Sequence, residues 1–169
     1  MAFTLTSPSF AAGEMIPALH TCDGPGMSPA LAWSDPPRGT KSLALLLEDP
    51  DARDESGKHL AFAHWVLYNI PTEAKDLSLG AGSGGELPTG AVEARNETGR
   101  AGYFAPCPSE GRHRYVFRLY ALDSVLRARS AVTREELVAA IARHVLATAE
   151  LVALYARQAN SSREAPMPT

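Results

Sequence analysis

Two aspartates and two histidines, residue types common in binding and catalytic sites, stand at the ends of apolar segments. Asp49-Pro50-Asp51 follows one such segment, His64 opens a second, and His113 opens a third. Proline fixes its own backbone and pushes the preceding Asp49 toward extended geometry, so both carboxylates are held at set angles. Protonated imidazoles can hold a phosphate, and carboxylates beside them can hold an ammonium or a P–OH proton. The set predicts one small pocket for an anionic ligand.

Other chemistries are open to the same residues. Two histidines and one carboxylate could form a facial metal triad, although His64 and His113 lack any short ligand spacing. A Ser-His-Asp hydrolase would need a Gly-x-Ser-x-Gly elbow, which the chain lacks. Each feature also has a purely structural interpretation. Asp-Pro-Asp is good turn chemistry, and a lone histidine in an apolar segment is more often a packed core residue.

The elements that would position these side chains are mostly strands. Apolar segments of strand length lie at residues 31–33, 42–48, 64–70 and 113–122. In the last of them His113, Tyr115 and Phe117 share one face. Arg114 and Arg118 mark the opposite face as the wetter one. We therefore expect His113 to begin its strand on the core side.

A long C-terminal helix is predicted after these strands. Thr133 and Glu136 form the ends of a capping box. Apolar residues then recur at steps of three and four, which predicts a helix running to about Arg157. The glycine-rich segment 80–85 predicts a flexible surface loop, and residues 159–169 predict a disordered tail.

The length and charge of the chain limit the kinds of partner that we expect. The chain has 169 residues, and we expect one domain over residues 1–158. Its 16 basic and 19 acidic residues give a net charge of −3, so no basic field for nucleic acid is expected. Neither a secretory signal nor an apolar run long enough to span a membrane is apparent. We therefore expect a cytoplasmic protein with no integral membrane association.

Two cysteines, Cys22 and Cys107, fit no C-x-x-C metal or redox spacing. Reduced thiols are the expectation for a cytosolic protein. The alternative is a bridge between the two, which would close a long loop and could add ~4 kcal/mol to stability.

Four motifs carry a resemblance to a known family. They are EDPDA (48–52), HWVLYNIP (64–71), GYFAPCP (102–108) and GRHRYVFRLYALD (111–123). They resemble the signatures of the phosphatidylethanolamine-binding protein family, in particular its bacterial Raf kinase inhibitor-like branch, and the similarity runs from about Phe3 to Arg157. The resemblance implies a mainly β fold. Its core would be an antiparallel Greek-key β-sandwich, with peripheral helices and a long C-terminal helix.

The resemblance also implies a ligand-binding set. By position the set is Asp49, Asp51, His64, Ala105, Pro106, His113 and Tyr115. Three departures from the family pattern bear on it: Arg53 replaces a proline, Phe104-Ala105 replaces Gly-Gly, and Ser109 replaces another proline. We expect the Ala105 methyl group to affect pocket size. We expect Arg53 to place a cation at the rim and to favour more acidic ligands.

The function expected from these residues is binding rather than catalysis. We expect a small phosphate-type anion or a phospholipid head group as ligand, with no metal and no other cofactor. Regulation of a protein partner, in the manner of a kinase or protease inhibitor, and a homodimeric state are implied by the resemblance alone. The alternative is a metal-dependent or acid/base hydrolase that uses Asp49, His64 and His113.

Overall fold

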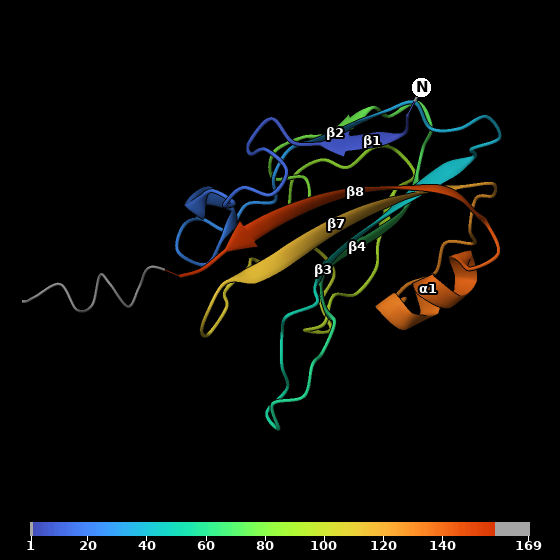
Figure 1. Ribbon diagram of the computed structural model, residues 1–169. Helices are drawn as coiled ribbons and strands as arrows, with labels where there is room; N and C mark the ends of the chain where they lie inside the picture. Colours follow the sequence, from blue (N-terminus) through green and yellow to red (C-terminus); the bar gives the residue numbers. More distant parts are fainter. Residues whose placement is uncertain (1, 158–169) are drawn as a thin grey trace, which may run out of the picture.

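The computed structural model describes residues 2–157 and is built mainly from antiparallel strands. One sheet has three strands in the order β1-β2-β5, and the other has five in the order β6-β4-β3-β7-β8 (Figure 1). The elements are β1 (Thr4–Thr6), a 3-10 turn (Ala18–His20), β2 (Leu31–Ser34), β3 (Ser42–Asp49), β4 (Phe62–Ile70), β5 (Asp76–Leu77), β6 (Val92–Glu93), β7 (His113–Leu122), α1 (Arg134–Ile141) and β8 (Val145–Tyr155). The mainly β prediction is confirmed, and a Greek-key connection of the strands stays a prediction.

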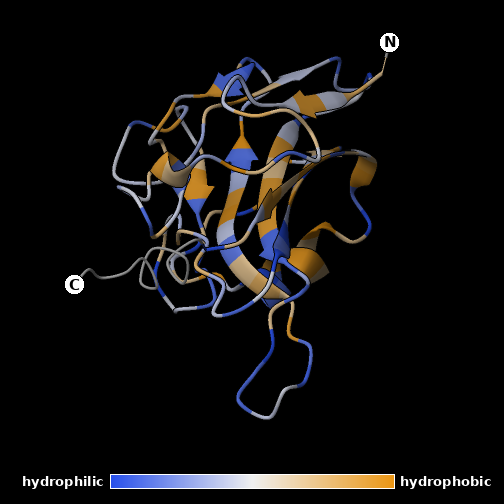
Figure 2. Ribbon diagram, turned by 60° about the vertical axis from the view of Figure 1, so that its left-hand side comes forward, coloured by the Kyte–Doolittle hydropathy of each residue, from blue (hydrophilic) through white to orange (hydrophobic). Residues whose placement is uncertain are grey.

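The larger sheet lies between two hydrophobic clusters, and β3 shows how one strand serves both. Leu43, Leu45 and Leu47 belong to the cluster shared with the small sheet. Ala44 and Leu46 alternate with them and belong to the cluster shared with α1. Successive side chains of a strand point to opposite faces, so an uninterrupted apolar run fits a strand covered on both sides. In Figure 2 hydrophobic colours follow the strands of this sheet, whereas the loop that projects furthest is hydrophilic.

The predicted strands are confirmed with small changes at their ends. β7 has the predicted bounds, and its buried face begins as expected with half-buried His113 followed by buried Tyr115 and Phe117. The segment 64–70 lies within β4, inside the larger sheet, and is buried throughout.

The predicted long C-terminal helix is wrong, because α1 ends at Ile141 and β8 begins at Val145. The capping box is confirmed: the Thr133 hydroxyl accepts the Glu136 N–H at 3.1 Å, and a Glu136 carboxylate oxygen accepts the Thr133 N–H at 3.0 Å. Beyond the helix, residues 149, 151, 153 and 155 are buried in alternation and pair with β7 along its whole length. A helix there would leave the edge of β7 without hydrogen-bond partners. Within residues 2–157, α1 and the 3-10 turn stand in place of several peripheral helices.

The glycine-rich segment is packed rather than flexible at its first half, contrary to the prediction. Gly80, Ala81 and Gly82 are buried. A Cβ atom on Gly82 would lie 2.5 Å from the Trp65 indole, so only glycine fits there. The Ser28 carbonyl accepts the Gly80 N–H at 2.8 Å, and the Ser28 hydroxyl accepts the Gly82 N–H at 2.8 Å.

Two further expectations concern the ends of the chain and membranes. The predicted disordered tail, residues 159–169, lies outside the described residues. Within the described part of the chain, no helix has both the length and the apolar character needed to cross a membrane.

Candidate functional site

A pocket of about 170 Å³ opens where β3 ends and β7 begins. Four residues that the sequence predicts for the site line it: Asp49, His64, His113 and Tyr115. Because β3 and β7 are antiparallel neighbours, the end of one strand lies beside the start of the other. The sheet thus brings together side chains that are far apart in sequence.

His64 reaches the pocket through an irregularity in β4. Leu47 of β3 pairs with Trp65, and the next β3 residue, Glu48, pairs with Ala63. His64 is therefore an extra residue without a partner on β3, which is the arrangement of a β-bulge. A bulge re-aims the side chain that it carries. The His64 ring then lies with Tyr115 edge to face, their centroids 5.4 Å apart.

The ring of His64 is tied to the loop that forms the opposite wall. Its Nδ1 lies 2.6 Å from the Phe104 carbonyl oxygen, and the His64 carbonyl accepts the Phe104 N–H at 2.9 Å. The side chain is buried, and burial lowers the pKa of His64 below its usual value, against a smaller upward effect of the Phe104 hydrogen bond. For His64, desolvation therefore outweighs the nearby Asp49 carboxylate, which acts in the opposite direction.

Asp49 supports the second histidine. Its Oδ2 lies 2.6 Å from His113 Nδ1, and its Oδ1 accepts the Asp51 N–H at 2.8 Å across Pro50. Asp49 is 3% exposed, so its charge is held almost entirely by protein groups. Burial, together with this nearby carboxylate, raises the pKa of the Tyr115 hydroxyl, which stays a neutral phenol.

Asp51 does not line the pocket. Its carboxylate accepts hydrogen bonds from Arg114 through the backbone N–H at 2.8 Å, Nε at 3.0 Å and Nη2 at 2.8 Å. The Arg114 hydrogen bonds lower the pKa of Asp51 to about 2. Asp51 is therefore engaged in a structural ion pair with Arg114.

Aromatic rings form the wall above the two histidines. Phe62 and Phe104 have centroids 5.8 Å apart, and Phe62 lies 4.9 Å from the His64 ring. Phe104 is 40% exposed, so part of its ring is open to solvent beside the pocket. The pocket lining thus combines aromatic rings with the polar side chains of Asp49, His64 and His113.

Cys22 and Cys107 form a disulfide, so the expectation of reduced thiols is wrong. Their Cα atoms are 5.4 Å apart, and the Cys22 N–H donates to the Pro106 carbonyl at 3.1 Å. Sequence spacing gave no sign of this bond, since a sequence separation of 85 is bridged only by the fold. Cys107 and the neighbouring Pro108 line the pocket. The bond fixes this wall to the N-terminal part of the chain.

Comparison with known proteins places the chain in a family. The family model described as phosphatidylethanolamine-binding protein matches residues 6–156. The chain belongs to the phosphatidylethanolamine-binding protein family. A UPF0098 protein of Methanothermobacter thermautotrophicus is 44% identical over 142 residues, 84% of this chain and 91% of that protein.

Solved structures agree with this assignment. The phosphatidylethanolamine-binding protein homologue CT736 of Chlamydia trachomatis has a TM-score of 0.83 and 41% identity, over 92% of this chain and 98% of that one. Escherichia coli YbcL, described as a member of the mammalian family, has a TM-score of 0.84 and 35% identity, over 93% and 99% of the two chains.

Three of the four residues that depart from the family pattern line the pocket. Arg53, Phe104 and Ser109 all line it, whereas Ala105 and Pro106 do not. The Ala105 methyl group lies instead beside Gly26. Sequence reasoning missed Ala52, Phe62, Cys107 and Pro108 as lining residues. For Phe62 a signal was available, namely an aromatic residue two positions before His64.

Proposed function

We propose that this pocket binds small phosphate-type anions, either free or as the head group of a larger molecule, and that the protein acts by binding. The observation that carries the proposal is the Asp49–His113 pair at the pocket wall, 2.6 Å between Oδ2 and Nδ1. A carboxylate on one ring nitrogen balances the charge of the imidazolium form. The other ring nitrogen can then donate to an anion.

The size of the pocket supports a head group rather than a whole lipid. Ligand pockets commonly have volumes of roughly 300–1,000 Å³, and this one has about 170 Å³. A ligand that fits makes only a few contacts, so we expect weak binding centred on the phosphate. Arg53 at the lining adds a cation that favours an acidic ligand.

A titration with inorganic phosphate and phosphoethanolamine tests the proposal. We expect the ring resonances of His64 and His113 to shift with both ligands, and the His113→Ala variant to lose most of the affinity. His144→Ala is the matched control, because His144 forms an equivalent pair with Asp123 at 2.8 Å but lies outside the pocket. Equal affinity of the wild-type protein and the His113→Ala variant would contradict the proposal.

No specific observation favours the hydrolase alternative. Within residues 2–157, no group of three or more His, Cys, Asp or Glu side chains is arranged to hold a metal ion. We therefore propose one function for the pocket.

Regulation of a protein partner and homodimer formation stay predictions from the family resemblance. The cytoplasmic location also stays a prediction, and the Cys22–Cys107 bond bears on it, because disulfides are rare in the reducing cytosol. Alkylation of free thiols in intact cells, before lysis, would decide the redox state and with it the compartment.

A further inference from the structure

The hydrogen-bonding direction of His64 is fixed by the fold. Its Nδ1 lies 2.6 Å from the Phe104 carbonyl oxygen. A carbonyl only accepts, so Nδ1 must carry the hydrogen. In the neutral imidazole, Nε2 is then a lone pair that accepts and cannot donate.

Burial keeps this ring neutral near pH 7. His64 is 4% exposed, and burial lowers its pKa more than any neighbour raises it. The titratable groups that face it are Asp49 on β3 and His113 with Tyr115 on β7. Asp49 raises the pKa of His64 and His113 lowers it, so the two partly cancel.

The acceptor faces the pocket. Among the described residues, Nε2 of His64 has no hydrogen-bond partner, and no fully buried side-chain nitrogen or oxygen lacks one. His64 is also part of the pocket lining. Nε2 is therefore open to a ligand and not to protein.

The two histidines thus require different hydrogen-bonding groups on a ligand. His113, backed by Asp49, can take a proton and donate to an anionic oxygen. His64, whose Nε2 can only accept, requires a hydrogen-bond donor on the ligand. We propose that the pocket selects oxyanions that carry a hydrogen, such as hydrogen phosphate or a phosphomonoester monoanion, over fully ionised ones. This inference rests on the proposed function and adds the protonation state of its ligand.

Sulfate and inorganic phosphate provide the test, because both are tetrahedral anions. Near neutral pH phosphate keeps at least one P–OH, whereas sulfate keeps no hydrogen. An acceptor left without a donor in a buried site costs roughly 1–3 kcal/mol, so we expect phosphate to bind about tenfold more tightly than sulfate at pH 7. We also expect the Nε2 resonance of His64 to move when phosphate binds while Nδ1 stays protonated.

The His64→Phe variant removes the acceptor and keeps a planar ring. It should bind phosphate and sulfate about equally, whereas Asp51→Asn, outside the pocket lining, should keep the wild-type preference. Should the His64→Phe variant fail to fold, glycerophosphoethanolamine and glycerophosphocholine give a second test on the wild-type protein. Neither diester has a P–OH, and the two share the same glycerol hydroxyls. They differ in that only the ethanolamine ammonium carries N–H donors, so glycerophosphoethanolamine should bind more tightly.

The outcomes separate the two proposals. Equal affinity of the wild-type protein for phosphate and sulfate, or tighter binding of sulfate, overturns the selection by His64 and leaves anion binding intact. Absence of any shift at His64 and His113 with either anion overturns anion binding and the selection together. A preference for phosphate that survives in His64→Phe assigns the selection to another group and overturns the role of His64.

Discussion

Glu48 and Asp49 are neighbours on β3, both almost fully buried, and yet they lie in opposite kinds of surroundings. Glu48 lies on the face toward α1 and receives two guanidinium groups, from Arg118 at 3.3 Å and from Arg134 of the helix. Asp49 receives one imidazole and one backbone N–H, and it lines the pocket. Two buried acids one residue apart are thus divided between the two faces of a single strand.

This difference indicates that the Glu48 cluster contributes to stability, whereas Asp49 contributes to ligand binding. Arg118 also pairs with Glu150, and Arg134 lies 3.9 Å from Glu135, so the charges of this cluster are matched within it and join the helix to the sheet. Asp49 instead hydrogen-bonds His113, and both residues line the pocket, so this acid bears on ligand binding.

Glu48→Ala should cause the largest loss of stability. Removing one member of a buried ion pair leaves its partners uncompensated, and we expect the free energy of unfolding to fall by about 3 kcal/mol because the arginines are partly exposed. Phosphate affinity should not change. Chemical denaturation measures the loss, and Glu150→Ala is the control: Glu150 also pairs with Arg118 but is half exposed, so about 1 kcal/mol or less is expected.

Unlike Glu48→Ala, the Asp49→Asn variant should show a large loss of affinity for phosphate. Asparagine cannot balance the imidazolium of His113, and a hydrogen bond to a charged group contributes roughly 1.5–3 kcal/mol. We expect phosphate affinity to fall by about tenfold to a hundredfold, measured by calorimetry. Asp51→Asn should change it by less than about threefold, and an equal loss in the two variants would contradict the division between these acids.

In mild acid the buried histidines should lower the stability of the protein. The pKa of His64 is lowered by burial, and the pKa of buried His20 is lowered in the same way. Below about pH 6.5 the unfolded chain therefore binds more protons than the folded one, and stability falls as pH falls. Each histidine contributes a slope of at most about 1.4 kcal/mol per pH unit. His64→Gln should flatten the curve between pH 7 and 5, and an unchanged slope would show that the ring is charged in the folded state.

The smallest effect is expected at Asp51 in strong acid. Its folded pKa is lowered to about 2 by Arg114, so its contribution is complete above about pH 4 and is lost as the pH falls toward 2. The Arg114 side chain is more than half exposed, so the contribution should be below about 1 kcal/mol. Comparing urea midpoints of Asp51→Asn and wild type at pH 5 and pH 2.5 measures it, and the two proteins should converge at the lower pH.

Local sequence patterns were sufficient to predict the elements whose secondary structure does not depend on a distant pairing partner. Alternation predicts β7 with its observed bounds, and the capping box predicts the start of α1. The segment 145–155 has both a helical stripe and a strand alternation. Its state is decided by pairing with β7, which begins 32 residues before it, and local propensity carries no information on that pairing.

The same limit on what local sequence patterns can predict applies to the site. The positions of Asp49, His64 and His113 near the ends of predicted strands, together with the family resemblance, predict that the three lie together. The separation of Asp51 from the pocket depends on Arg114 capturing it, and the inward turn of His64 depends on a bulge between β3 and β4. Both are properties of neighbouring strands in register, which the order of residues along the chain does not express.

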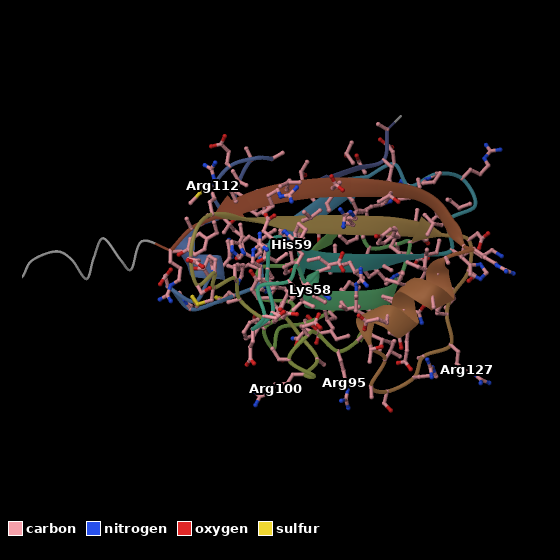
Figure 3. All side chains as sticks on the ribbon, turned by 60° about the horizontal axis from the view of Figure 1, so that its bottom comes forward. Lys58, His59, Arg95, Arg100, Arg112 and Arg127 are labelled. Atoms are coloured by element: carbon pink, nitrogen blue, oxygen red, sulfur yellow. A yellow bond between two sulfur atoms is a disulfide. The ribbon has the colours of Figure 1, made fainter. Side chains whose placement is uncertain are left out.

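The disulfide also determines how the molecule responds to a broken chain. Residues 22–107 form a closed covalent ring, and the exposed loop between β3 and β4, which carries the Lys58 and His59 side chains labelled in Figure 3, lies inside it. A single cut in this loop puts Asp49 on one fragment and His64 on the other. The fragments remain one molecule, which should run as one band on a gel until a reductant separates them.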